Sequence, residues 1–287
     1  MMGKLKTLLE FIRIEHNIFS LTFVYAGAFL SVRGIPGLEK LAWITLALVG
    51  ARSGAIVLGD IADRELDALN PRTKDRHLPS GRVSMREAWA IVLVSYTMLF
   101  YSARMLNPLA FALAPVPLLL AVAYPYSKRY TAAAHLVLGL NLAFAPLGGW
   151  VGATGSLALP PLVLSAAVAL WVAGFDIIYA CQDMEFDRRM GLHSIPAALG
   201  ASGALRASAL MHALTLLLLY AVQRIMSLGL FYLMGVLIIA LLLLYEHLMV
   251  GAGRLERVPV AFFHVNALVS LAVFTFAALE VLFPVPL

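Results

Sequence analysis

Two segments of the chain carry aspartates at a spacing that suits cation binding. Asp63 and Asp67 lie in the first segment, Asp183 and Asp187 in the second, and both pairs read Asp-x-x-x-Asp. Residues four apart share one face of a helix, so the two carboxylates of each pair are expected to point the same way. Carboxylates at this spacing repel each other, and a cation between them removes the repulsion.

The chemistry of these side chains favours one kind of cation. Carboxylate oxygens without paired His or Cys suit Mg²⁺ rather than Zn²⁺, and Mg²⁺ takes water and substrate phosphates as its remaining ligands. The four aspartates are therefore predicted to be catalytic metal ligands that hold a diphosphate between Mg²⁺ ions. The alternative is two solvated helix ends whose charge is balanced by Arg64, Arg188 and Arg189.

Basic residues follow the first aspartate pair and recur in a later polar segment. Arg72, Arg76, Lys128 and Arg129 are predicted to bind the substrate, because arginine forks and lysine point charges both suit phosphate oxygens. The alternative is that these residues only mark one side of a membrane.

Arg52 lies inside an apolar run, eleven residues before Asp63 and on nearly the same helical stripe. An arginine within a membrane span is a functional residue by default. Arg52 is therefore predicted to bind an anionic group of a substrate that lies beside the metal site. The alternative is an internal ion pair with Asp60 or Asp176.

The composition of the chain assigns it to the membrane. Of its 287 residues 62% are hydrophobic and 13% are charged, and the mean hydropathy is +0.89. A soluble chain has about a quarter charged residues, so a soluble enzyme, a disordered chain and a secreted disulfide scaffold are excluded. We expect one all-α domain over residues 1–287 with nine membrane spans. These spans are placed near 18–32, 41–61, 88–106, 108–126, 134–153, 161–182, 206–223, 228–250 and 262–283, with eight spans as the alternative count.

The basic residues predict the orientation of these spans. With nine spans, sixteen Lys and Arg fall on the side of the N-terminus, Arg254 and Arg257 among them, and four fall on the other side. This asymmetry predicts a multi-pass protein of the cell membrane with its N-terminus and both aspartate segments in the cytoplasm. No aromatic-basic module for nucleic acid is visible, and the sequence leaves the oligomeric state open.

The two aspartate pairs also suggest an internal repeat. Asp63 and Asp183 are 120 residues apart, as are Asp67 and Asp187, and each pair follows the end of an expected span. This offset predicts two units of about four spans each. The alternative is a chance similarity between two short polar loops.

Three motifs, found in order along nearly the whole chain, resemble those of a known family, the UbiA superfamily of intramembrane aromatic prenyltransferases, and within it the 4-hydroxybenzoate polyprenyltransferases. The motifs are Arg52-x6-Gly59-Asp60-x2-Asp63-x3-Asp67 with Asn70-Pro71-Arg72-Thr73 and Leu78-Pro79-Ser80-Gly81, then Tyr124-Pro125-Tyr126-Ser127-Lys128-Arg129-Tyr130, and then Phe175-Asp176-x2-Tyr179-x3-Asp183-x3-Asp187-x3-Gly191-x2-Ser194.

The resemblance implies nine helices around a central cavity, capped by the two cytoplasmic aspartate loops. It also implies Mg²⁺-dependent transfer of a polyprenyl group from an isoprenyl diphosphate to an aromatic acceptor such as 4-hydroxybenzoate. In that case Arg52 binds the acceptor carboxylate, and Tyr124 and Asp176 position or deprotonate the phenol. His77 and His193 border the two loops, where a lone histidine is more often structural than catalytic. Asn141 is expected either to line the cavity or to form an interhelical hydrogen bond.

One residue departs from the motif, because the family usually has Asn where this chain has Gly59. Asp60 or water is expected to take the role of that side chain. Other acceptors (haem, dihydroxynaphthoate or a glyceryl lipid) and a cation-coupled transporter are the alternative functions. A CDP-alcohol phosphotransferase is disfavoured, because no Asp-Gly-x2-Ala-Arg element is present.

Overall fold

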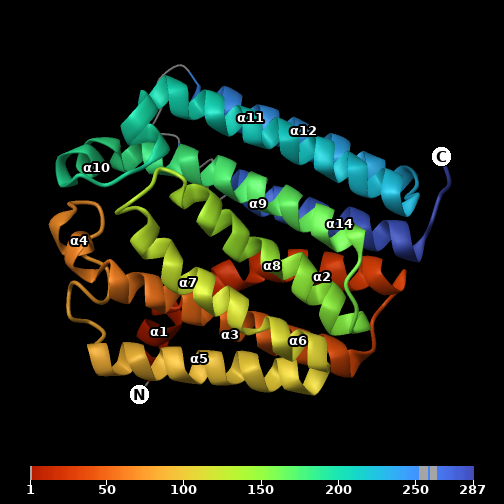
Figure 1. Cartoon of the computed structure of the whole chain (residues 1–287), viewed down its shortest axis with the longest axis horizontal. Helices are drawn as coiled ribbons and strands as arrows, with labels where there is room; N and C mark the ends of the chain where they lie inside the picture. Colours follow the sequence, from red (N-terminus) through yellow and green to blue (C-terminus); the bar gives the residue numbers. More distant parts are fainter. Residues whose placement is uncertain (1, 252–257, 259–263) are drawn as a thin grey trace.

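The protein is a bundle of antiparallel helices, seen here in a computed structural model that describes residues 2–251, 258 and 264–287 (Figure 1). No strand occurs within these ranges. Arg254, Arg257 and the first two residues of the expected ninth span lie outside them. The helices, in chain order, are α1 (Met2–Phe11), α2 (Ile14–Val32), α3 (Leu38–Ala62), α4 (Arg64–Leu69), α5 (Met85–Leu106), α6 (Pro108–Leu113), α7 (Pro115–Ser127), α8 (Ala134–Thr154), α9 (Leu159–Ala180), the 3₁₀ turn η1 (Cys181–Asp183), α10 (Met184–Met190), α11 (Ile195–Met226), α12 (Leu230–Val250) and α14 (Asn266–Leu282).

Seven helical stretches in the described part of the chain are long and apolar enough to cross a bilayer, and they coincide with the expected spans two to eight. The expected first and ninth spans are represented by shorter apolar helices, Ser20–Val32 and Asn266–Leu282. Large apolar side chains on the outside of the bundle, such as Leu93, Leu119 and Leu217, are well exposed. A surface of this kind is stable in lipid, so the chain is a multi-pass membrane protein.

The third and fourth spans are separate helices. Asn107 ends α5, and its side-chain oxygen accepts a hydrogen bond from the Ala110 amide at the start of α6 (2.8 Å). Its side-chain amide donates to the Val151 carbonyl at 2.8 Å, which fixes the turn to α8. Pro108 then occupies the first turn of α6, where its missing N–H costs nothing. The third and fourth expected spans are therefore not one continuous helix.

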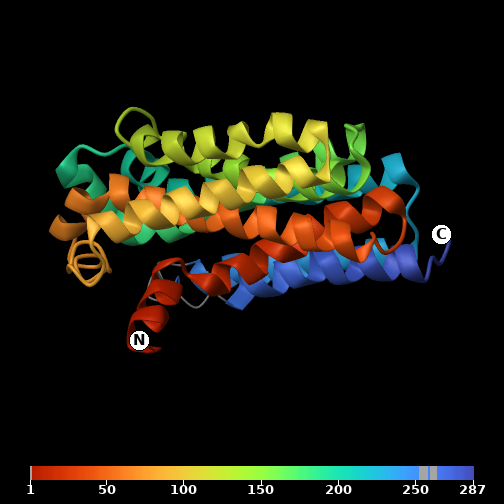
Figure 2. The same ribbon diagram turned by 90° about the horizontal axis from the view of Figure 1, so that it is seen from below.

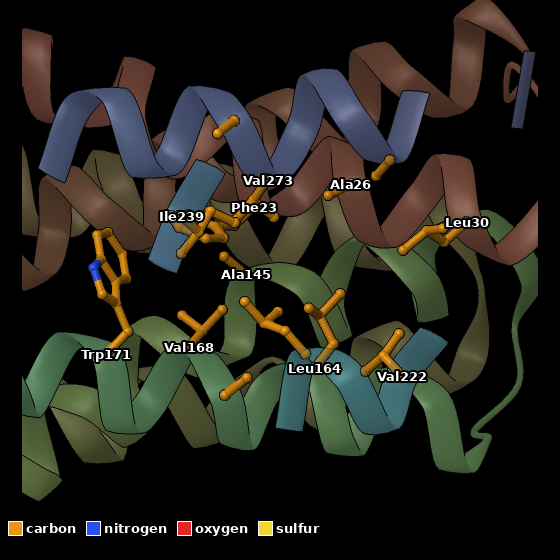
Figure 3. Close-up of a cluster of buried hydrophobic side chains, with 14 of the residues drawn as sticks. Phe23, Ala26, Leu30, Ala145, Leu164, Val168, Trp171, Val222, Ile239 and Val273 are labelled. Atoms are coloured by element: carbon orange, nitrogen blue, oxygen red, sulfur yellow. The ribbon is translucent and has the colours of Figure 1, made fainter. Parts of the chain in front are cut away.

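Six of the helices, α2, α8, α9, α11, α12 and α14, form a closed ring of contacts. α2 contacts α3, α8 and α14; α8 also contacts α7 and α9; and α11 and α12 close the far side. Apolar side chains from α2, α8, α9, α11, α12 and α14 meet between them, including Phe23, Val168 and Trp171 (Figure 3). α4 and α10, which carry the second aspartate of each pair, lie at the same end of the bundle (Figures 1 and 2). We call this the aspartate end.

Two basic residues at the opposite end have a structural role. The Arg33 guanidinium donates to the Met226 carbonyl at 2.7 Å, and the Lys40 ammonium donates to the Ala153 carbonyl at 2.5 Å. Both carbonyls belong to the last turn of a helix, where a cation is favourable. These contacts explain two of the four basic residues that the sequence places away from the aspartate end.

The contact between α2 and α8 depends on glycines. A Cβ atom at Gly149 would lie 1.8 Å from the Val24 carbonyl oxygen, and one at Gly27 would lie 2.0 Å from the Pro146 carbonyl oxygen. Small residues of this kind let two membrane helices approach backbone to backbone.

Gly149→Ala is therefore expected to force α2 and α8 apart and to destabilise the protein by roughly 1–3 kcal/mol, as overpacking does. Thermal unfolding in detergent checks this as a lower midpoint temperature. Gly148→Ala is the matched control, because a Cβ there has no heavy atom within 4 Å. Equal midpoints for the two variants would contradict the role of this contact.

Candidate active site

Each aspartate pair lies across a junction between two helices. α3 gives way to α4 at Asp63 (φ −94°, ψ 2°), and η1 gives way to α10 at Asp183 (φ −102°, ψ 4°). Each pair therefore includes the residue at which one helical segment ends and the next begins. In the first pair, hydrogen bonding continues from the Asp67 amide to the Asp63 carbonyl (2.7 Å), so the chain bends without losing a backbone partner. The matching geometry of the two junctions supports the predicted repeat, which stays a prediction.

Both aspartate pairs face one cavity of about 320 Å³ at the aspartate end. Eleven of the twelve residues predicted from the sequence line it: Arg52, Asp60, Asp63, Asp67, Arg72, Arg76, Tyr124, Lys128, Asp176, Asp183 and Asp187. Arg129 does not. Its guanidinium donates to the Ala62 carbonyl at the end of α3 (3.3 Å) and lies over the Tyr126 ring, 5.0 Å from the ring centroid.

The segment after the first aspartate pair is bonded directly to the second pair. The Asn70 side-chain amide donates to Asp183 Oδ1 at 3.1 Å, and the Arg72 guanidinium forms an ion pair with the same carboxylate. Arg72 also donates to the Tyr179 hydroxyl at 2.9 Å. The Asn70 side-chain oxygen in turn accepts from the Arg72 amide at 2.9 Å, which shapes the loop. The two halves of the site are thus held together across the cavity.

A second cluster of ion pairs surrounds the first aspartate pair. Arg76 Nη1 lies 2.8 Å from Asp67 Oδ2 and 3.8 Å from Asp60 Oδ1, and Arg13 Nη2 lies 3.0 Å from Asp60 Oδ1. The described residues show no ion pair between the aspartates and Arg64, Arg188 or Arg189. Arg72 and Arg76, which neutralise aspartates of the two pairs, are also two of the residues that the sequence predicts to bind phosphate.

The donor set of the site suits Mg²⁺ that is shared with a substrate. Among the described residues, no group of three or more His, Cys, Asp or Glu side chains is placed to hold a metal ion alone. Mg²⁺ typically takes one or two protein carboxylates and fills its octahedron with water and phosphate oxygens. Asp63 Oδ1 is buried and has no hydrogen-bond partner within the described chain. Burial raises the pKa of the Asp63 carboxyl, while the nearby Lys128 ammonium lowers it. Asp63 Oδ1 is therefore a buried carboxylate oxygen that a cation could still coordinate.

Arg52 lies deeper in the cavity. Its Nε is buried and has no hydrogen-bond partner among the described residues. The predicted alternative of an ion pair with Asp60 or Asp176 does not occur, because Asp60 pairs with Arg13 and Asp176 contacts His135. A second, apolar cavity of about 110 Å³ begins here, and Arg52 and Asn141 line both cavities. Arg52 is thus a buried cation at the boundary between polar and apolar space.

Sequence reasoning missed one contact of the predicted catalytic residues. His135 is buried, and its Nδ1 lies 2.7 Å from Asp176 Oδ2, so the imidazole fixes this carboxylate at the cavity wall. The available signal was an ionisable residue at the start of an apolar run. Lys128 Nζ lies 5.3 Å from the Tyr124 ring centroid, a cation–π distance. Of the two flanking histidines, His193 lines the cavity, and His77 packs against Phe11 instead.

Comparison with known proteins agrees with this architecture. The model of the UbiA prenyltransferase family matches residues 20–268. A 4-hydroxybenzoate octaprenyltransferase from Vibrio parahaemolyticus is 32% identical over 246 residues, which is 85% of this chain and 86% of the relative. A solved apo structure of a UbiA homolog from Aeropyrum pernix K1 superimposes with a TM-score of 0.84 at 40% identity, over 92% of this chain and 97% of that chain. A UbiA homolog from Archaeoglobus fulgidus bound to GPP and Mg²⁺ shares the fold (TM-score 0.71, 21% identity, 95% and 99% covered).

The fold and the cavity with two facing aspartate pairs define an intramembrane enzyme of prenyl transfer. The chain belongs to the UbiA prenyltransferase family. The resemblance found in the sequence is therefore confirmed at the level of the family and of the enzyme class. This membership favours an enzyme over the cation-coupled transporter that the sequence left open.

The ion pairs at the site predict competition between Arg76 and a cation for Asp67. Arg76→Gln is expected to tighten the binding of Mn²⁺, used as a probe for Mg²⁺, by about fivefold in the absence of substrate. This corresponds to roughly 1 kcal/mol for a partly exposed pair. Calorimetric titration of the purified protein measures the change. Arg64→Gln, an exposed arginine on α4, is the control, and unchanged or weaker Mn²⁺ binding by Arg76→Gln would contradict the competition.

Proposed function

We propose that the protein transfers a polyprenyl group from an isoprenyl diphosphate to 4-hydroxybenzoate, with Mg²⁺ as cofactor, as a step in the synthesis of a quinone-type lipid. The observation that carries this proposal is the cavity itself. The four aspartates of the two pairs line this cavity together with three cations that suit phosphate, Arg72, Arg76 and Lys128. Apolar side chains and the buried Arg52 line the rest of it. The names of the relatives support the choice of acceptor and donor.

The aspartate end suits the diphosphate. Asp63, Asp67, Asp183 and Asp187 would hold Mg²⁺, which when bound neutralises the diphosphate so that it can leave. Arg72, Arg76 and Lys128 would bind the phosphate oxygens, and Arg72 and Arg76 would release Asp183 and Asp67 as they do so. Arg129 and Asp60 are expected to affect substrate binding indirectly. Arg129 contacts the end of α3, and Asp60 pairs with Arg13 and Arg76.

The deeper part of the cavity suits the organic groups. Phe175, Trp171 and Val168 line it and exclude water, which protects an allylic cation until it reacts. The C1–O bond of the donor breaks, the ring carbon beside the acceptor hydroxyl bonds to C1, and that ring carbon then loses its proton. Asp176, which contacts His135, would accept a proton, and Tyr124 would orient the acceptor hydroxyl.

Arg52 would fix the acceptor. A carboxylate on the ring would pair with this buried guanidinium, whose Nε has no hydrogen-bond partner among the described residues. Acceptors of the other branches, such as haem, dihydroxynaphthoate or a glyceryl lipid, remain the alternative substrates for the same chemistry. The proposed orientation in the cell membrane, with the aspartate end in the cytoplasm, gives water-soluble acceptors access to the cavity.

Membranes that contain the protein are expected to convert a polyprenyl diphosphate and 4-hydroxybenzoate into the 3-prenyl product, detected by mass. Asp63→Asn and Asp183→Asn should lower this activity by at least about 100-fold, and EDTA should abolish it until Mg²⁺ is added back. Glu65→Gln and Glu185→Gln, which alter exposed acids beside the same motifs, are the controls. Full activity in EDTA would contradict the role of the metal.

Arg52→Gln is expected to raise the KM for 4-hydroxybenzoate by roughly 10-fold to 100-fold, because a charge-assisted contact to the carboxylate is lost. The KM for the prenyl diphosphate should change little. A phenolic acceptor without a carboxylate should react equally poorly with both proteins. If the wild type prefers the acceptor that lacks the carboxylate, Arg52 does not have this role.

A further inference from the structure

Arg13 lines the cavity, yet neither the sequence motifs nor the proposed chemistry gives it a role. It joins α1 to α2 in the left-handed backbone region (φ 47°, ψ 61°), which is uncommon for a residue other than glycine. Such a conformation persists where the surroundings determine it. Its Nη2 lies 3.0 and 3.3 Å from the two carboxylate oxygens of Asp60.

The N-terminal helix that leads to Arg13 is fastened to the first aspartate segment. α1 lies beside the bundle near the aspartate end (Figure 2). Phe11 is buried with Leu58 and Leu78, and its ring contacts that of His77 at a centroid distance of 5.7 Å. The Lys4 ammonium lies 2.7 Å from the Glu87 carboxylate. These contacts hold α1 in place and so fix the position from which Arg13 reaches Asp60.

Asp60 is shared between two arginines. It is 7% exposed, so its negative charge needs a positive partner. Among the described residues, Arg13 at 3.0 Å and Arg76 at 3.8 Å are the cations within ion-pair distance of it. Arg76 at the same time contacts Asp67 at 2.8 Å. If Arg13 did not neutralise Asp60, that carboxylate would attract Arg76 more strongly.

We propose that Arg13 is a positioning residue for the isoprenyl diphosphate. By neutralising Asp60, it leaves Arg76 free to turn from the aspartates to the phosphate oxygens. Arg13 acts through Asp60 and Arg76 and does not touch the donor itself. This inference rests on the proposed function, because it takes Arg76 as a ligand of the diphosphate.

The test is a suppressor experiment on the full-length protein in membranes. Arg13→Gln is expected to raise the KM for the prenyl diphosphate about 5-fold to 10-fold with kcat changed less than about twofold, which is the pattern of lost ground-state binding. Arg13→Gln/Asp60→Asn should return the KM to within about twofold of wild type, because the uncompensated charge of Asp60 that would attract Arg76 is then removed. Lys6→Gln is the control, since this exposed lysine of α1 pairs only with Glu10 on its own helix among the described contacts.

A second measurement distinguishes a role of Arg13 in positioning Arg76 from a role in holding α1 in place. Arg13→Gln should bind Mn²⁺ without donor at least as tightly as wild type, because Arg76 moves from Asp67 toward Asp60. If Arg13 only anchors α1, or contacts the phosphates itself, Asp60→Asn will not rescue the KM and the inference is overturned. If Arg13→Gln does not fold, Arg13→Met, which also removes the charge, makes the same comparison with and without Asp60→Asn, and the same rescue is expected.

Failure of the proposed function gives a different result. If the wild type forms no prenylated product, or if Arg76→Gln leaves the KM for the donor unchanged, the assignment of Arg76 and of the diphosphate site is wrong. If Arg76→Gln raises that KM and Arg13→Gln does not, the diphosphate site stands and the role of Arg13 is overturned.

Discussion

Repulsion between carboxylates is the constraint on which the aspartate end of this protein depends. Six aspartates face one cavity at the end of an apolar bundle: Asp60, Asp63, Asp67, Asp176, Asp183 and Asp187. Part-buried negative charges are stable only when cations and hydrogen bonds compensate them. Arg72 and Arg76 provide this compensation from the loop between α4 and α5 and thereby draw the two aspartate segments together. The same ion pairs give the loop its conformation and the site its shape.

The apolar part of the bundle makes this arrangement possible. Helices that approach closely, as α2 and α8 do at Gly27 and Gly149, form a rigid frame in which the aspartate end is held. The helices line this cavity with Phe, Trp and Val side chains as well as with the charged ones. An isoprenyl diphosphate, the proposed donor, likewise has a charged group at one end and a hydrocarbon chain at the other. The cavity and this donor therefore match in polarity.

The sequence predicted most of the charged residues that line the candidate site, because they stand out as residue types at fixed spacings. The two Asp-x-x-x-Asp motifs, Arg52 and the basic residues Arg72 and Arg76 all reach the cavity. The sequence did not reveal the break at Asp63, since helical spacing is the same on both sides of a short bend. It also did not reveal the pairing of Arg13 with Asp60 or of His135 with Asp176, because both join segments more than 40 residues apart. Arg129 shows the opposite case, in which a basic residue beside Lys128 points elsewhere.

The ion pairs of Arg72 with Asp183 and of Arg76 with Asp67 have a consequence for the end of the proposed reaction. When the diphosphate leaves with its cations, the carboxylates would not face water alone, because the two arginines would return to them. Departure of the product would then be an exchange of partners at roughly constant charge, and its cost would be smaller than that of separating bare ions. Because the arginines proposed to hold the product are also the counter-ions of these aspartates, tight binding and rapid turnover would not oppose each other.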